Sequence, residues 1–497
     1  MPREHWKPIV AVSIVVVLAV TGIAGFLYFS GSTPTPAPSP SRCASSATAP
    51  ETVAPGWQAS YRAGCLDAAG NLMGGSELMH LVAHDGMLFA AVGYWEDTAN
   101  INYGGTNSSE GWAQILRLDA PNGQWAVDLT MNRVVRPDIL DSVTFTTNGA
   151  GEPLSQPVTL LITAACLGNA GADLYTRNDT TGQWVTSTIV PGPTGPGCDA
   201  RADAVYQDPI TGVDRLFVSL GDLGVYSGVY DPTAPGDILW SRTSESGRVA
   251  VRPLAIVEAN GNLFASSGAL VYERVNGPSP SWRVLVNENH LPGGTTLNPA
   301  VGGIRGLTAV PHPTGSGQSL LFLWVPGNQS MGDIVRLDPN GSGGYTTTIE
   351  TSLSPLASKY LNTSAYIVLG AYNNILPVTD PATGAVDYVI GLQTWVRNTT
   401  GLPTMWWGNA SGGTYAGALY AIRNSTGSYS MGGVNGKIEA GNPPLEAIRS
   451  YAISPFPSDH GNVIYFGGYD ADDHLCNDTA WVFSTTLSNA LGEGDNV

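Results

Sequence analysis

Short segments in which apolar and polar residues alternate recur along most of the chain, and turns rich in Gly, Asn, Asp and Pro separate them. A period of two is typical of β-strands, and such turns between two strands predict hairpins. No convincing helical period is present after the apolar N-terminal segment. The pattern therefore predicts an all-β domain.

One hairpin pattern recurs five times. Each copy has an apolar strand with a charged or polar centre, a turn with Gly or Asn, and then an aromatic residue, and an apolar segment precedes each copy. The copies are residues 113–125, 172–184, 269–282, 332–345 and 417–429. Self-similarity of this kind is typical of repeat architectures.

The segments that open the repeats can also be aligned, with successive units 51 to 76 residues apart. Their first polar residues are Glu77, Asp141, Arg201, Arg252, Arg305, Asn373 and Arg449. Four short strands in each of seven units predict a seven-bladed β-propeller over residues 56–487. Two other folds fit the pattern less well. The repeats of a β-helix are shorter than these units, and stacked sandwich domains would have about 100 residues each, with linkers between them.

The seventh unit has no outer strand of its own, because the residues after it, 488–497, are polar and rich in glycine. Residues 57–61 match the outer-strand pattern of the first unit. An open edge strand is a template for aggregation, so a ring of strands is expected to be closed. We therefore predict that the N-terminal strand at 57–61 completes the last blade and that residues 488–497 form a flexible tail.

Two segments show the repeat most clearly: residues 462–483 (NVIYFGGYDADDHLCNDTAWVF) and residues 115–125 (ILRLDAPNGQW). An apolar strand ends in glycines, a variable loop follows, and an apolar strand then leads to Asp, a turn and Trp. This pattern resembles the kelch repeat. The resemblance extends over residues 57–487, although the paired glycines are present only in the seventh unit. It implies the architecture of a seven-bladed β-propeller and no particular activity.

Residues 8–29 form an uncharged apolar segment that is long enough to cross a bilayer as a helix. A cleaved signal peptide is the alternative, but its apolar region is usually about 7–15 residues long. Arg3 and Lys7 precede the segment, so residues 1–7 are expected in the cytoplasm. Residues 30–55 are rich in Pro, Ser and Thr and predict a stalk. We therefore expect a single-pass, signal-anchored protein of the cell surface or another membrane, with its C-terminal domain extracytoplasmic.

Nine N-x-S/T sequons are consistent with an extracytoplasmic glycoprotein. They are Asn107, Asn178, Asn328, Asn340, Asn362, Asn398, Asn409, Asn424 and Asn477. They are used only in a host that has the glycosylation machinery.

The five cysteines also suit an oxidising compartment. Cys43 lies in the predicted stalk, and the other four allow three pairings. We favour a disulfide between Cys166 and Cys198, which flank one repeat junction. The remaining disulfide, between Cys65 and Cys476, would join the two ends of the domain.

The chain has 22 basic and 40 acidic residues and a net charge of −18. Such a chain has no basic field to hold a phosphate backbone, which excludes nucleic acid as an expected partner. His80 and His84 would lie about 13 Å apart along one face of a strand, too far to share a metal ion. The stretch Asp470, Asp472 and Asp473 lacks the rest of an EF-hand loop. We therefore expect no metal and no cofactor.

The first strands of a propeller are innermost, so the seven aligned polar residues are expected to face one mouth of a central channel. Four guanidinium groups there would bind carboxylate, sulfate or phosphate groups. These seven residues are therefore the candidate ligand-binding residues. The alternative is internal neutralisation, with Arg449 beside Glu77 and Asp141 beside Arg201.

No G-x-S-x-G elbow is present and no Ser, His and Asp set stands out, so no catalytic residue is assigned. Trp406 and Trp407 suit sugar stacking or a protein contact, with a packed loop as the alternative. The sequence favours a membrane-anchored extracellular recognition or scaffold module that binds an anionic or glycan ligand, or a protein. The alternative is an extracellular propeller enzyme that acts on carbohydrate, a hydrolase or a lyase.

Overall fold

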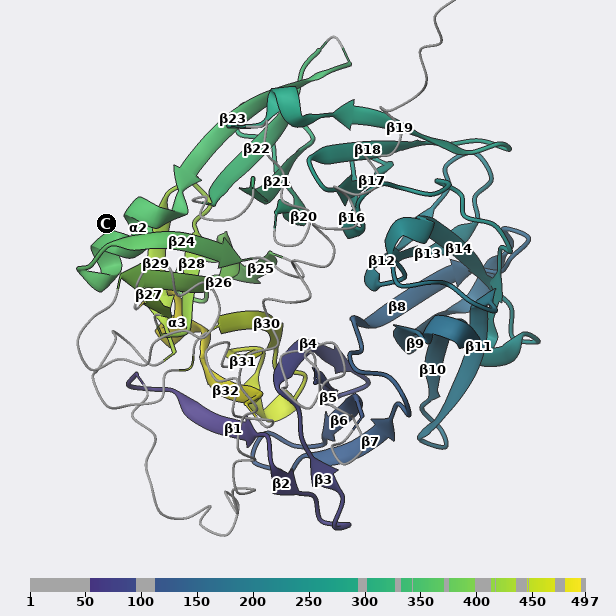
Figure 1. Ribbon diagram of the computed structural model, residues 1–497, viewed down its shortest axis with the longest axis horizontal. Helices are drawn as coiled ribbons and strands as arrows, with labels where there is room; N and C mark the ends of the chain where they lie inside the picture. The colour runs from purple at the N-terminus through teal and green to yellow at the C-terminus, as the bar shows by residue number, and fades with distance from the viewer. Residues whose placement is uncertain are drawn as a thin grey trace, which may run out of the picture.

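The computed structural model shows small antiparallel β-sheets arranged around a common centre, so the domain is all-β and propeller-like (Figure 1). The structure describes residues 54–94, 112–293, 302–326, 332–341, 343–370, 375–397, 413–415, 417–434, 445, 447–469 and 479–492. Within these ranges no helix has the length and hydrophobicity needed to cross a bilayer. The predicted anchor at 8–29, residues 30–53 of the predicted stalk and residues 493–497 of the predicted tail lie outside the described residues. The prediction of a flexible tail is wrong for residues 488–492, because they belong to helix α3 (Leu487–Gly492).

Four of the sheets contain four strands each, in the order in which the chain forms them. The first has β8 (Ile139–Thr147), β9 (Pro153–Cys166), β10 (Gly171–Asn178) and β11 (Gln183–Pro191). The second has β12 (Ala200–Gln207), β13 (Asp214–Leu220), β14 (Val225–Tyr230) and β15 (Ile238–Trp240). The third has β16 (Pro253–Ala259), β17 (Asn262–Ser267), β18 (Leu270–Val275) and β19 (Ser281–Val286). The fourth has β20 (Gly303–Pro311), β21 (Gln318–Val325), β22 (Asp333–Pro339) and β23 (Tyr345–Ser352).

A fourteen-stranded sheet holds three further groups of strands. One group is β4 (Glu77–His84), β5 (Met87–Gly93), β6 (Gln114–Leu118) and β7 (Ala126–Thr130). Another is β24 (Ala365–Gly370), β25 (Leu376–Thr379), β26 (Val386–Arg397), β27 (Gly413–Tyr415), β28 (Leu419–Arg423) and β29 (Tyr429–Gly433). The last is β30 (Ala447–Ile453), β31 (Val463–Tyr469), β32 (Trp481–Thr486) and β1 (Gln58–Arg62). Only single residue pairs, Tyr469 with Glu77 and Gln393 with Ala447, join these groups into one sheet.

The predicted pairing of the N-terminal strand with the last unit is present. Strand β1 runs antiparallel to β32, from Gln58 opposite Ser484 to Arg62 opposite Trp481. Just before β1, the Trp57 ring packs edge-on against Phe466, with 5.0 Å between ring centroids. Two segments more than 400 residues apart in the sequence therefore form one sheet, because each covers the open edge of the other.

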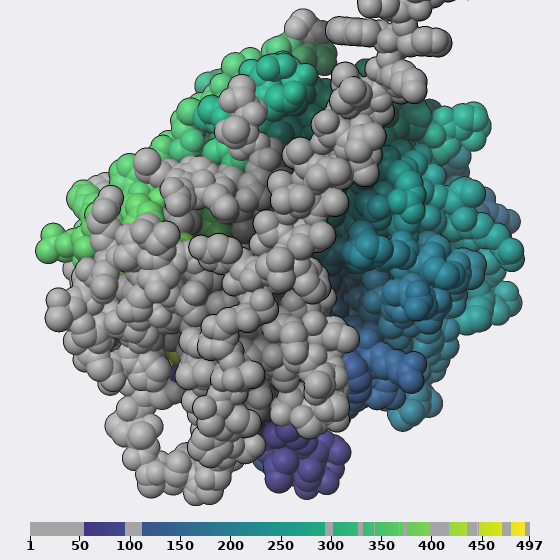
Figure 2. All heavy atoms as spheres, in the orientation of Figure 1, coloured from purple at the N-terminus to yellow at the C-terminus, as the bar shows by residue number. Residues whose placement is uncertain are grey.

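The predicted disulfide between Cys166 and Cys198 is confirmed, with its Cα atoms 5.8 Å apart. It links the end of β9 to the segment that leads into β12. Cys65 is also disulfide-bonded and begins β2. Its predicted partner, Cys476, lies outside the described residues, so that pairing stays a prediction. The short hairpin of β2 (Cys65–Leu66) and β3 (Leu72–Met73) projects at the rim of the domain, in purple (Figure 2).

The expectation of no helix in the domain is wrong in two places. Helix α2 (Leu353–Leu361) follows β23, and α3 (Leu487–Gly492) follows β32. Helix α2 buries Leu353, Leu356, Ala357, Tyr360 and Leu361, which is the i, i+3, i+4 spacing of an amphipathic helix. Nine residues give the pattern only two and a half turns, which is too short to stand out between strands. Five 3-10 turns complete the described elements: Gly168–Ala170, Gly221–Leu223, Pro235–Asp237, Glu288–His290 and Pro457–Asp459.

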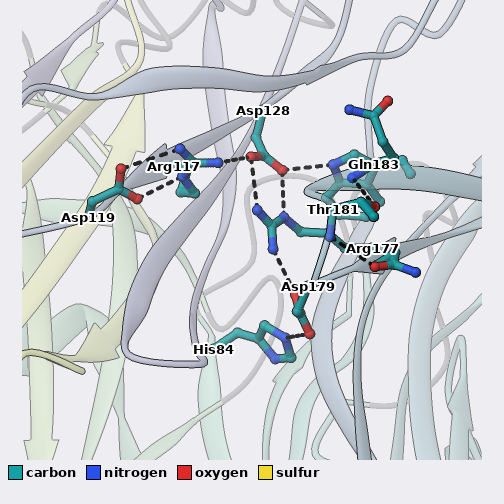
Figure 3. A network of polar contacts seen from close by, with 10 residues as sticks. His84, Arg117, Asp119, Asp128, Arg177, Asp179, Thr181 and Gln183 are labelled. Atoms are coloured by element: carbon teal, nitrogen blue, oxygen red, sulfur yellow. Dashed lines mark hydrogen bonds and ion pairs between the residues drawn. The ribbon is translucent and has the colours of Figure 1, made fainter.

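A network of ion pairs and hydrogen bonds around Asp128 joins the group β4–β7 to the sheet β8–β11 (Figure 3). Arg177 of β10 donates from Nε to Asp128 of β7 at 2.9 Å, and Trp184 of β11 donates to the same carboxylate at 2.8 Å. Arg117 of β6 also donates to Asp128, at 2.5 Å. Asp179 then links Arg177 to His84, at 2.7 and 2.9 Å. One buried carboxylate thereby binds two sheets together.

The same arrangement recurs at two other seams, where we define a seam as the contact between two neighbouring sheets. Arg274 and Trp282 both donate to Glu245, at 2.6 and 3.0 Å. Arg423 and Tyr429 both donate to Glu350, each at 2.6 Å. In each case the Arg and the aromatic residue come from one repeat of the hairpin pattern and the carboxylate comes from the preceding sheet or the segment after it. The arginine at the centre of each of these three repeats therefore forms a contact with a neighbouring sheet.

Candidate functional site

Six of the seven predicted channel-mouth residues are described, and all lie at or beside the start of a first strand. Glu77 begins β4, and Arg252 directly precedes β16. The others, Asp141, Arg201, Arg305 and Arg449, are second or third in β8, β12, β20 and β30. These strands neighbour one another in the order β30, β4, β8, β12, β16, β20, and they surround the centre of the domain (Figure 1). Asn373 lies outside the described residues.

The predicted contact between Arg449 and Glu77 is present as a hydrogen-bonded ion pair. The two side chains are 4% and 0% exposed. Ions buried so deeply are tolerated only when they are paired, because removing each one from water is costly. At this contact the internal-neutralisation interpretation holds.

The predicted contact between Asp141 and Arg201 is wrong. Arg201 donates to Asp199 at 2.8 Å and lies 3.3 Å from Asp138. Asp138 and Asp199 each directly precede a first strand, so they lie level with Arg201 at the entrance to their strands. Asp141 is further along β8, where it meets Asp203 of β12 instead.

Three further residues belong to this site and were not predicted from the sequence: Arg136, Asp138 and Asp199. Arg136 forms an ion pair with Asp138 and contacts Asp199 at 3.3 Å. His80 Nε2 donates to the backbone carbonyl of Asp138 at 2.8 Å, which fixes its tautomer. Burial lowers the pKa of His80 to about 3, so this histidine is neutral. One feature of the sequence could have indicated Asp138 and Asp199. Each is an acidic residue directly before a first strand, in the segments 137–140 (Pro-Asp-Ile-Leu) and 198–201 (Cys-Asp-Ala-Arg).

We call the resulting set the axial cluster. It comprises Glu77, His80, Arg136, Asp138, Asp199, Arg201, Arg252, Arg305 and Arg449. Five guanidinium groups face three carboxyl groups in it. Burial raises the pKa of Asp138 to about 7, against the pull of Arg136 and Arg201. Burial also opposes ionisation of Asp199, but Arg201, Arg136 and Arg252 outweigh it and hold the Asp199 pKa below its usual range. Among the described residues, the axial cluster therefore contains more positively charged than negatively charged groups.

Arg252 is the most exposed arginine of the axial cluster. Its side chain is 30% exposed, whereas those of Arg201 and Arg136 are 8% and 9% exposed. Among the described residues it forms one ion pair, to Asp199 at 2.9 Å, and that carboxylate already contacts two other arginines. Burial lowers the pKa of Arg252 to about 10, and repulsion from Arg201 adds to this effect. An anion bound beside Arg252 would therefore stabilise the charged form of its guanidinium.

A second pair of carboxyl groups, Asp141 and Asp203, lies next to the axial cluster on β8 and β12. Burial raises the pKa of both groups, and the neighbouring Asp141 carboxyl raises the pKa of Asp203 further. Two adjacent carboxyl groups in such surroundings share one proton rather than both ionise. A pair of this kind can donate and accept a proton. That chemistry is what the predicted alternative, a carbohydrate hydrolase or lyase, requires.

The remaining predicted sites are scattered over the surface. The sequons Asn178, Asn340 and Asn362 are exposed, and Asn424 is half-buried. The other five sequons, the acidic stretch at 470–473 and the Trp406–Trp407 pair lie outside the described residues. In the described part of the chain, no three His, Cys, Asp or Glu side chains are placed to hold a metal ion.

No family model and no curated protein matches the chain. Among solved structures, it is similar to a protein of unknown function from Dyadobacter fermentans, with 8% identity and a TM-score of 0.39 over 87% of this chain and 100% of that one. It is also similar to a fungal alcohol oxidase of the AA5 family in complex with copper, with 12% identity and a TM-score of 0.40 over 86% of this chain and 76% of that one.

Proposed function

We propose that this chain is a seven-bladed β-propeller held outside a membrane by residues 8–29 and a stalk at 30–55. Its axial cluster is the recognition site for a ligand that carries a carboxylate, sulfate or phosphate group. The four separate four-stranded sheets, the three groups in the larger sheet and the closure by β1 support the propeller. The uncharged apolar segment at 8–29 supports the anchor.

The state of Arg252 carries the proposal. Its guanidinium is partly exposed, it shares one carboxylate with two other arginines, and its pKa is lowered to about 10. An oxyanion placed beside it would form charge-assisted hydrogen bonds and relieve the repulsion from Arg201. The overall negative charge of the protein would make this a local positive site, which attracts anions selectively. A recognition module needs such a site, and a purely structural cluster would be fully neutralised.

The test is calorimetric titration of the full chain in detergent micelles with sulfate, phosphate and galacturonate at low ionic strength, where screening is weak. We expect at least one of these anions to bind. Arg252→Gln should weaken it about 10-fold or more, since hydrogen bonds to charged groups contribute about 1.5–3 kcal/mol. Arg283→Gln is the matched control, because Arg283 is 61% exposed on β19 and, within the described part of the chain, forms its ion pair with Glu273.

Stability provides the second measurement. The surroundings of Arg252 disfavour its charge, so Arg252→Gln should leave the melting temperature unchanged or raise it. The proposal is wrong if none of the three anions binds. It is also wrong if Arg252→Gln lowers the melting temperature while anion affinity stays the same, because the cluster would then be structural.

A further inference from the structure

A polar cavity lies at the seam between the sheet of β12–β15 and the sheet of β16–β19. Its volume is about 420 Å³, within the range of roughly 300–1,000 Å³ typical of small-molecule sites. None of its lining residues belongs to the axial cluster. The cavity is therefore a separate feature of the molecule.

The cavity exists because β15 is short. β15 has three residues and pairs with β14 only from Gly228 to Tyr230. The corresponding outer strands β11 and β19 have nine and six residues. After β15 the chain bulges away from β14: the backbone N–H groups of Ser241 and Glu245 still donate to the carbonyls of Ser227 and Val225, each at 2.8 Å. Ser241, Thr243 and Ser244 line the cavity. The seam is hollow here and its wall is rich in hydroxyl groups.

Two polar groups on the wall have no partner among the described residues. Ser227 is 4% exposed, and its hydroxyl forms no hydrogen bond to any described residue. The guanidinium of Arg215 forms no ion pair or hydrogen bond within the described part of the chain, although it lines the same cavity. Polar groups shielded from bulk water are costly unless they find a partner. Both groups are thus available to a ligand.

The cavity carries no net charge. Arg274 is 2% exposed and bridges Asp208 at 2.7 Å and Glu245 at 2.6 Å. With Arg215, two cations face two carboxylates. A charged ligand therefore gains no net attraction here, whereas a ligand with hydroxyl groups can donate to the carboxylate oxygens and accept from Arg215 and Ser227.

The cavity lining also includes apolar residues. Pro278 and Pro280 belong to its wall. Ile210 is 63% exposed beside Thr211, which also lines the cavity. A lining that combines hydroxyl and charged groups with apolar residues matches a sugar ring, which has hydroxyl groups at its edge and C–H bonds on its faces.

We propose that this seam cavity is a binding site for a neutral saccharide of one or two rings. Arg215 and Ser227 supply the free hydrogen-bonding groups, and the Arg274 bridge holds Asp208 and Glu245 in place. The site does not depend on the anion site proposed for the axial cluster, and the two can be tested independently.

The test is saturation-transfer difference NMR on the full chain in detergent micelles. The probes are the methyl glycosides of glucose, galactose, mannose and N-acetylglucosamine, with cellobiose and glucuronate added. We expect at least one neutral sugar to bind. Arg215→Gln removes the free guanidinium and should weaken that sugar about 10-fold or more. Thr243→Trp should fill the cavity without disturbing the core, because Thr243 is exposed.

Two variants serve as controls. Arg283→Gln changes an exposed arginine on β19, outside the cavity lining, and Arg252→Gln changes the axial cluster. Sugar binding that is retained in both controls and lost in Arg215→Gln and Thr243→Trp supports the proposal. The proposal is overturned if no sugar binds, if only glucuronate binds, or if binding survives both cavity variants. Thermal unfolding of each variant confirms that it is folded.

Discussion

At the scale of single residues, burial beside other carboxyl groups sets the chemistry at the centre of the domain. Asp141 and Asp203 lie on neighbouring first strands, and burial raises the pKa of both. The Oδ2 atom of Asp203 is shielded from solvent and has no hydrogen-bond partner in the described structure. Ionising the pair fully would place two negative charges side by side in a poorly solvated site. The pair therefore keeps a proton that an exposed pair would release.

This proton predicts a pH dependence of stability. A carboxyl group whose pKa is raised on folding stabilises the fold below its unfolded pKa, near 3.8, and that contribution is lost as pH rises through the folded pKa. Asp203→Asn removes the ionisable group. The difference in melting temperature between Asp203→Asn and the unmodified protein should therefore be near zero at pH 4 and should increase, in favour of the variant, up to pH 8. Thermal unfolding across this range measures the difference.

The control for this prediction is Asp119→Asn, which changes a carboxylate that is 60% exposed. It should show no comparable gain as the pH rises. A difference between Asp203→Asn and the unmodified protein that stays constant from pH 4 to pH 8 would show that the pair is ionised throughout.

The sequence could indicate which residues meet at the centre but not how they pair. Polar residues at the starts of aligned strands predicted that Arg201, Arg252 and Arg449 approach one axis. The partner of Arg201 could not be predicted, because it depends on a shift of a few residues between β8 and β12. Asp138 and Asp199 precede their strands and so fell outside the aligned positions.

At the scale of strands and sheets, the recurring arginine of the hairpin pattern holds neighbouring sheets together. Asp128 is 2% exposed and accepts hydrogen bonds from Arg177, Arg117 and Trp184. Arg177 also lies 5.2 Å above the Phe89 ring. Arg274 repeats this placement over Phe217, also at 5.2 Å. The repeat therefore conserves a contact between sheets as well as the fold of each hairpin.

Removing this carboxylate should destabilise the domain. Asp128→Ala would leave the buried Arg177 without its main partner, and breaking a buried ion pair typically costs about 3–5 kcal/mol. Asp119→Ala is the matched control, because Asp119 pairs with Arg117 at the surface, where such pairs contribute about 0–1 kcal/mol. Denaturant unfolding of both variants measures the difference. Equal losses would mean that the buried carboxylate does not hold the sheets together.

The local sequence pattern predicted the hairpins well. It did not predict features that depend on the contact between neighbouring sheets. Alternation, turn residues and the aromatic position are properties of one hairpin, so they can be read from the sequence. The shortness of β15 leaves no such signal, because residues 241–251 are as rich in Ser and Arg as a turn or a polar strand. The seam cavity follows from that short strand and from Arg274 in the next sheet, so only the assembled structure shows it.

At the scale of the whole molecule, the two ends of the domain depend on each other. Strand β1 covers the edge of β32, and the hydroxyl of Thr485 donates to the carbonyl of Gly56 at 2.9 Å. Trp57 is 5% exposed and packs against Phe466 and Tyr420. The last group of strands would otherwise end at β32, with unpaired backbone groups along its outer edge.

Deleting residues 54–62 should therefore unfold or loosen the whole ring rather than one edge of it. The deletion removes β1 and exposes the edge of β32, and loss of the buried tryptophan alone typically costs about 3–5 kcal/mol. A deletion of equal length at 30–38 is the control, since it only shortens the predicted stalk and should leave the melting temperature unchanged. Cys65 is retained in both variants, so its disulfide is not a variable. Thermal unfolding of the two deletion variants compares them directly. The same cooperative transition at the same temperature in both would show that the ring does not need β1 to close it.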